Sequence, residues 1–225
     1  MKIVVVTVPG MTILRGECDN RAGITTLLPH SDFNYLGFLK LCYMYKLTTR
    51  ICITSFVLLL VSQIHAQTPE AIKAQMVKDW ERAKEYTMEY LNTMPSDKYS
   101  FKANDSIRSF AQQMLHLAAA NVGLLSSVST EKAPAGISFT LEQRATAQSK
   151  DSVVYYVMAS YDYARNTVKN SDVSKWGEVK KIFGRYDETT FAMMLKAFEH
   201  QTHHRGQTTI YIRLVGIKPP QEKLF

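Results

Sequence analysis

Apolar residues recur at intervals of three and four along residues 68–215, which is the spacing of amphipathic helices. The first helix is predicted over about 68–94, because Thr68 and Pro69 are favourable residues at a helix start and Pro95 follows the last apolar position. Its apolar face consists of Ile72, Met76, Trp80, Ala83, Tyr86 and Tyr90. A face of this kind is expected to pack against other helices.

The same spacing predicts three more helices. The second is expected after Asn104 and Asp105, the third begins near Asp151, and the fourth runs from about 188 to 215, where Gly216 ends it. The apolar face of the second consists of Ile107, Phe110, Ala111, Met114, Ala118, Val122 and Leu125. That of the third consists of Val154, Val157, Met158, Tyr161 and Val168.

Polar residues fill the connections at 129–147 and 170–187, and no alternating pattern of useful length predicts a β-strand. Four helices of roughly 20 residues joined by such connections predict an all-α fold, a four-helix bundle. Residues 67–225 are therefore expected to form one domain. Neither a glycine-rich phosphate loop nor a nucleophile elbow is present in the sequence.

Residues 44–66 have the three parts of a secretory signal. Lys46 and Arg50 form a basic start, residues 51–64 are apolar, and Ile64-His65-Ala66 is an acceptable cleavage site before Gln67. The apolar part is shorter than the roughly 20 residues of a membrane span. Cleavage predicts export to the periplasm or medium, with no stable membrane span afterwards. A retained anchor and a buried helix remain as alternatives.

Residues 1–43 precede this signal, although a signal belongs at the N-terminus of its protein. The simplest interpretation is that translation begins at Met44 and that the upstream stretch is a start-site artefact. A genuine, disordered extension is the alternative.

Charge and cysteine content exclude several classes of function. The formal net charge is +7, but residues 67–225 contribute only +4 of it and show no stripe of Lys or Arg, so nucleic-acid binding is not expected. Cys18, Cys42 and Cys52 all precede residue 67. The predicted domain therefore has no disulfide, no thiolate nucleophile of its own and no cysteine-ligated zinc.

The fourth predicted helix carries three histidines within five residues, at His200, His203 and His204. His200 and His204 are one turn apart, so both imidazoles can face one metal ion. His203 lies to the other side of His200; it could replace His204 geometrically but cannot share one ion with both. Nearby, Arg205, Gln207 and Tyr211 are candidates for contacts that orient the imidazoles.

Some of these neighbours have plainer explanations. Arg205 could form a surface or interhelical salt bridge, and Tyr211 could simply pack. Gly206 costs about 1 kcal/mol inside a helix compared with alanine. Its presence indicates either close helix packing or room near a metal.

A third ligand must come from a facing helix. His116 is the remaining histidine of the predicted domain, and it shares a helix face with Ser109, Gln113, Ala120 and Gly123. That small and partly polar face suits a cavity between helices, but it also suits solvent.

The run "HQTHHRGQTTIYIRLVGIKPP" resembles the end of the DinB/YfiT-like family of metal-binding four-helix bundles. The matching positions are His200, His204, Arg205, Gly206, Gln207, Tyr211, Arg213, Gly216, Pro219 and Pro220. A second stretch, residues 94–121, is similar to the family's N-terminal half and places its first ligand histidine at His116.

The resemblance implies a metal site of His116, His200 and His204 that holds nickel, zinc or a similar divalent ion, with open positions for water or substrate. It implies that His203 is not a ligand. The wider superfamily includes thiol-dependent S-transferases and isomerases, and family members often form dimers, so a homodimer is expected.

Three functions remain open on the sequence. The first is an exported metal-dependent enzyme of hydrolase or unassigned type acting on a small molecule, or else a thiol-dependent S-transferase; Glu142 and Glu199 are candidate general bases. The second is a non-catalytic metal-binding or stress-response bundle, and the third is a partner-binding bundle without metal.

Overall fold

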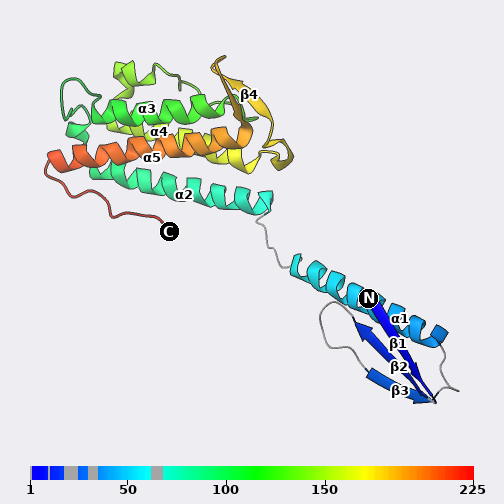
Figure 1. The fold of residues 1–225 in the computed structure, drawn as a ribbon. Helices are drawn as coiled ribbons and strands as arrows, with labels where there is room; N and C mark the ends of the chain where they lie inside the picture. The colour runs from blue at the N-terminus through cyan, green and yellow to red at the C-terminus, as the bar shows by residue number, and fades with distance from the viewer. Residues whose placement is uncertain (1, 10, 18–24, 30–34, 62–67) are drawn as a thin grey trace. The chain divides into compact units, whose positions relative to one another are not determined.

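The computed structural model describes residues 2–9, 11–17, 25–29, 35–61 and 68–225, and the chain divides into two compact units at Ala66 and Gln67. The second unit contains four long helices (Figure 1), and its remaining elements are short. The helices are α2 (Pro69–Thr93), α3 (Phe110–Leu125), α4 (Lys150–Lys169) and α5 (Thr190–Leu214). The structure is therefore mostly helical, as the apolar spacing predicts.

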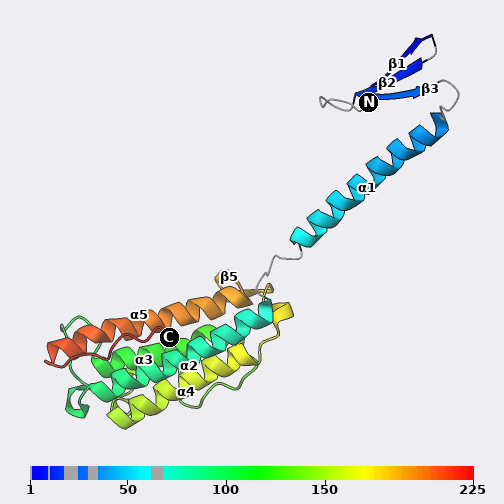
Figure 2. The ribbon, with the colours of Figure 1, turned by 90° about the horizontal axis from the view of Figure 1, so that it is seen from below.

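The four helices form a bundle in which α3 packs against α4 and α5, and α2 packs against the same two helices (Figures 1 and 2). Apart from Ile107, which is exposed, the predicted apolar faces of α2 and α3 lie in the core, where Trp80 contacts Tyr161 and Phe198 edge to face. Aromatic contacts of this geometry add to the stabilisation from burial. The bundle holds α3 and α5 side by side, and these are the two helices that carry the selected histidines.

The helix ends follow local capping chemistry. Thr68 caps α2 as expected, since its side chain accepts a hydrogen bond from the Ala71 N–H. The predicted start of α3 after Asn104 is wrong, because Ser109 and Gln112 form a capping box that begins the helix at Phe110. The Asn104 side chain instead accepts bonds within a turn, and Ile107 lies outside the helix.

Residues 179–189 form a two-stranded hairpin, which contradicts the prediction that residues 67–225 contain no strands. Strands β4 (Val179–Ile182) and β5 (Tyr186–Thr189) pair antiparallel. The turn contains Phe183 and Gly184, both with positive φ, as a tight hairpin turn requires. The hairpin is mostly exposed, with only Ile182 buried, so its sequence lacks the alternation on which the prediction depended.

The connection between α3 and α4 is packed rather than loose. It contains the short 3-10 helices η2 (Leu141–Gln143) and η3 (Ala145–Ala147); two others, η1 (Ser96–Lys98) and η4 (Val173–Lys175), lie in the other connections. Leu141 is fully buried, and the Phe139 ring lies directly over Gly123 of α3. Burial of Leu141 fixes its neighbour Glu142 beside the helix face that carries His116.

The first unit holds strands β1 (Lys2–Val8), β2 (Met11–Glu17) and β3 (Thr25–Pro29) in one antiparallel sheet, and helix α1 (Tyr35–Val61). No strand is predicted in residues 1–43, since a continuous apolar run such as that of β1 does not alternate. No helix among the described residues is long and apolar enough to cross a membrane. The expected cleavage site at residues 64–67 lies outside the described residues.

Candidate metal centre

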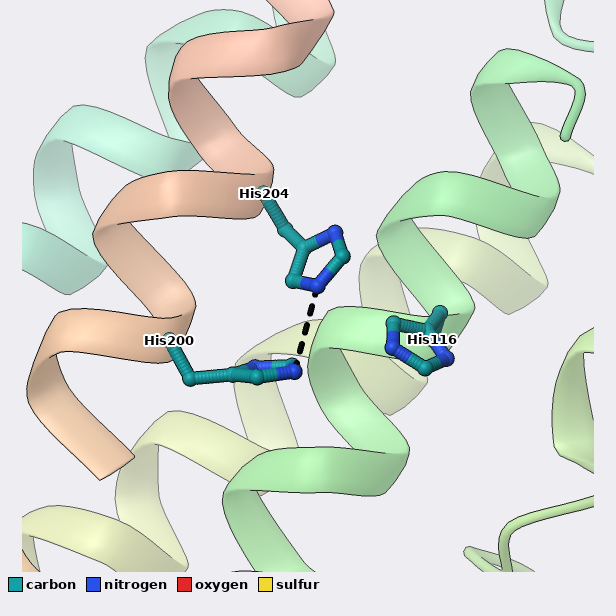
Figure 3. Close-up of side chains that lie close together, drawn as sticks. All are labelled: His116, His200 and His204. Carbon is teal, nitrogen blue, oxygen red and sulfur yellow. Dashed lines mark hydrogen bonds between the residues drawn. The ribbon is translucent and has the colours of Figure 1, made fainter. Parts of the chain in front are cut away.

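The bundle brings together the three histidines that the sequence analysis selected. His116 projects from α3, and His200 and His204 project from α5 toward it (Figure 3). One ring nitrogen from each lies within 4.8 Å of the other two. The ring centroid of His116 is 5.4 Å from that of His200 and 4.6 Å from that of His204. His116 therefore faces its partners, although 26% of its side chain is exposed.

The spacing of the imidazoles fits one small divalent ion. The Nε2 atoms of His200 and His204 are 3.1 Å apart. Two nitrogens bound to one tetrahedral zinc at about 2.0–2.1 Å are separated by about 3.3 Å. The helical spacing of four residues thus brings the two lone pairs close to the separation that a shared ion needs.

A carboxylate fixes the orientation of His116. Its Nδ1 is 2.7 Å from Glu142 Oε2, and the same oxygen accepts a hydrogen bond from Nε of Arg108 at 3.0 Å. With the Nδ1 proton donated to Glu142, the lone pair of His116 is on Nε2. A carboxylate behind a ligand imidazole is the usual outer partner of a metal-binding histidine.

An amide fixes His204. The side chain of Gln113 lies 2.7 Å from His204 Nδ1 and also contacts Gln207, whose Nε2 is 3.0 Å from His203 Nε2. As placed, the Gln113 N–H donates to Nδ1, and the His204 proton on Nε2 is shared with His200. For His204 Nε2 to bind a metal, its proton must move to Nδ1 of the same ring. The side-chain amides of Gln113 and Gln207 must then flip, so that their oxygen and nitrogen atoms exchange places. Amide oxygen and nitrogen are nearly equal in size, so this exchange needs little space.

His200, unlike its two partners, has no side chain in the described part of the chain that orients its ring from behind. Its Nδ1 is buried and has no hydrogen-bond partner among the described residues. An unpaired buried polar atom costs about 1–3 kcal/mol. Within the same residues, Trp80 Nε1 and Asn121 Oδ1 are buried and unpaired as well, so this state by itself does not mark a ligand. Here the ring is held with Nε2 toward His204. Together with the two oriented partners, this donor set fits a divalent cation.

The surroundings keep the imidazoles neutral. Burial lowers the pKa of His200 to about 4 and that of His204 to about 3, and the neighbouring imidazoles add to both shifts. Burial and the charge of Arg108 also lower the pKa of His116, although Glu142 opposes this. Neutral imidazoles are the form that binds metals, so protons compete weakly for this cluster at pH 7.

The metal-free protein should lose stability as the pH falls below about 6.5. In the unfolded chain the histidines take up protons near that pH, whereas His200 and His204 in the folded protein do so only at far lower pH. Protonation therefore favours the unfolded state, and the contribution is complete only above the unfolded pKa. Urea unfolding between pH 7.5 and 5 measures this. In the His200→Gln/His204→Gln double variant, the free energy of unfolding should fall less steeply with decreasing pH. Equal pH dependence in the variant and the native protein would show that these two histidines are not its cause.

A cavity of about 790 Å³ opens beside His204. It is lined by Ala103, Ser106, Ile107, Arg108, Gln113, Glu142, His203, His204, Gln207, Ile210 and Tyr211. Its size is within the range of small-molecule sites, and its wall combines polar groups with a few apolar side chains. A cation held by the histidines would therefore be next to space that can admit a small molecule.

The other selected residues take different positions. Gln207 is next to Gln113, as described, and Tyr211 lines the cavity while its hydroxyl donates to the Arg108 carbonyl at 2.8 Å. Arg205 is buried and its guanidinium lies over the Tyr86 ring and donates to Gln201, so it contacts the core and not the imidazoles. Its position indicates a role in joining α5 to α2.

Gly206 has neither of the two expected explanations. A Cβ atom added there meets nothing within 4 Å, so the position is neither a close helix contact nor space required by a metal. Gly206→Ala should raise the free energy of unfolding by about 1 kcal/mol, because alanine is the better helix former. The midpoint of thermal unfolding, Tm, should rise by about 2–4 °C. Gly177→Ala, equally open but outside a helix, is the matched control, and a decrease in Gly206→Ala would contradict this description.

Of the three residues around the histidines, Gln113, Glu142 and Arg108, only Arg108 is absent from the sequence-based predictions. Gln113 has a local signal, because it is three residues before His116 and shares its helix face. Glu142 was predicted only as a general base, and Arg108 was not singled out. Glu142 contacts His116 from the α3–α4 connection, and Arg108, just before α3, contacts Glu142; no sequence spacing is diagnostic of either contact.

Comparisons with known proteins agree with the fold. A DinB-like protein from Bacillus cereus is 14% identical, with a TM-score of 0.53 over 65% of this chain and 95% of its own. One from Bacillus subtilis is 18% identical, with a TM-score of 0.50 over 67% and 96%. One from Exiguobacterium sibiricum, a putative member of the DinB family, is 15% identical, with a TM-score of 0.51 over 67% and 95%. At these identities the likeness shows the fold alone.

No curated protein matches the sequence. The family model described as "DinB family" matches residues 65–224, which is well over half of the chain. That match covers α2 to α5 and all three clustered histidines. The chain therefore belongs to the DinB family.

Proposed function

We propose that this DinB-family protein binds one divalent cation, nickel or zinc, through Nε2 of His116, His200 and His204, and that it is a metal-dependent enzyme acting on a small molecule. The observation that carries the proposal is the convergence of three ligand nitrogens within 4.8 Å. Three protein ligands that leave a coordination position open are typical of catalytic centres, whereas structural centres are closed by four.

The chain's own groups support such a reaction in distinct ways. Glu142 and Gln113 hold two of the imidazoles, and the cavity gives access from the side of His204. A divalent cation at this place supplies Lewis acidity, which can polarise a substrate or acidify water for hydrolysis. Glu142 is already bonded to His116 and Arg108, so its main role is to orient His116, not to act as a free base.

The cavity is what favours an enzyme over a storage module. A scavenging protein needs the ligands but no adjoining space, whereas turnover needs both. Transfer to a thiol is the second candidate reaction, because a soft thiolate is also a good ligand for these metals. We further propose that the protein is exported, on the strength of the signal-like residues 44–66, and that it forms a homodimer.

Elemental analysis tests the metal proposal directly. After incubation with nickel or zinc and removal of excess metal by gel filtration, the purified protein should retain about one ion per chain. A metal-free protein after loading with either ion would refute the proposal.

A further inference from the structure

The cavity beside the histidines contains one fixed positive charge. Arg108 is the only lysine or arginine among the residues that line the described cavity. Its Nε–H is donated to Glu142, but no hydrogen bond or ion pair of its two terminal amino groups is found among the described residues. The side chain is 40% exposed. The guanidinium is thus anchored at one edge and has donors left for a ligand.

The backbone of Arg108 is held in place as well. The Tyr211 hydroxyl of α5 donates to the Arg108 carbonyl, and Ser109, the next residue, caps α3. A guanidinium fixed in this way presents its remaining N–H groups in a planar fork, which matches the two oxygens of a carboxylate. The ligand therefore needs little reorganisation of the protein in order to bind.

The other residues that line the cavity determine what kind of molecule can carry the carboxylate. Ile107, Ile210 and the Tyr211 ring supply apolar surface, while His204 and Gln113 lie in the same cavity. A small molecule with its anionic end at Arg108 and an apolar middle can therefore extend toward the histidine cluster. The cavity thus combines a cationic group for the anion, an apolar wall for the middle of the molecule, and the histidine cluster for its other end.

Charge decides between the common anions. Arg108 and Glu142 neutralise one another, so the anchor offers directed donors but little net positive charge. A monoanionic carboxylate is accommodated by such a pair better than a phosphate dianion, which adds a second negative charge next to Glu142.

We propose that Arg108 binds the carboxylate of a small organic acid and thereby directs the acid's other end to the histidine cluster. This inference rests on the proposed function and names its substrate class. It makes Arg108 a substrate-positioning residue, which no pattern in the sequence indicates.

The anchor can be tested without any metal. NMR titration of the metal-free protein compares 4-methylpentanoate with its uncharged analogue 4-methylpentanamide and with inorganic phosphate. The acid should bind about tenfold more tightly than the amide and more tightly than phosphate, and should shift the backbone amides of residues 106–109 and 210–211. Arg108→Gln should bind acid and amide equally, Arg108→Lys should keep part of the preference, and Arg185→Gln in the exposed β4–β5 turn should behave as the native protein.

A second titration tests the connection to the metal. With the protein loaded with cobalt(II), 4-mercaptobutanoate and 4-mercaptobutanamide should both produce a thiolate-to-cobalt absorption band. The acid should do so at about tenfold lower concentration in the native protein, and at equal concentration in Arg108→Gln.

The outcomes separate the two proposals. Failure to bind cobalt, nickel or zinc would refute the metal proposal but leave the first titration as the measure of the anchor. Equal binding of acid and amide by the native protein, tighter binding of phosphate, or a preference retained in Arg108→Gln would each refute the assignment of Arg108.

Discussion

The His204→Ala variant should retain no stoichiometric nickel or zinc under conditions in which the native protein retains about one ion per chain. His204 Nε2 is 3.1 Å from His200 Nε2, and its ring is the nearer of the two α5 rings to His116. Its removal leaves two ligands, on different helices, and the four-residue spacing that aims two imidazoles at one point is lost. Elemental analysis after gel filtration measures the loss, which is the largest effect expected for a single substitution.

The neighbouring histidine provides the control. His203 is exposed, its Nε2 is 3.0 Å from Gln207, and it is not part of the three-histidine group. His203→Ala should therefore bind metal as the native protein does. If His204→Ala proves unstable, His116→Gln serves instead, because it keeps a side chain of similar reach on α3. Metal retained at full stoichiometry by both ligand variants would show that the ion binds elsewhere.

Glu142→Gln should weaken metal binding by about 10–100-fold without abolishing it. The carboxylate accepts the Nδ1–H of His116, which fixes the ring and makes Nε2 a stronger donor. Glutamine preserves the volume and can still accept a hydrogen bond, but it removes the negative charge that stabilises a cation-bound imidazole. Competition with a chromophoric chelator measures the affinity of each variant.

Glu199→Gln is the matched control, because Glu199 is an exposed acidic residue on α5 next to His200. It should leave the affinity within about twofold, as expected for a surface charge. Equal affinities of the native protein and Glu142→Gln would show that the carboxylate does not contribute to metal binding, and the role assigned to it in orienting His116 would be wrong.

The helices and the histidine pair could be predicted because both depend on local spacing. A helix places residues four apart on one face whatever surrounds it, so His200 and His204 could be paired from the sequence. The same periodicity identified the apolar faces of α2 and α3 that form the core. The hairpin β4–β5 could not be predicted, because it is stabilised by a turn with positive φ and only one of its residues is buried.

What the sequence determined by itself is a four-helix unit with two imidazoles aimed at a common point from α5. Tertiary structure alone decided that His116 faces that point, that Glu142 from the connection after α3 meets Arg108 from the connection before it beside His116, and that a cavity opens next to the cluster. The reason is physical. Helix geometry repeats every turn, so it can be recognised from the spacing of residues in the sequence, whereas contacts between elements depend on how the connections pack. Leu141, buried far from any helical pattern, is the residue whose packing places Glu142.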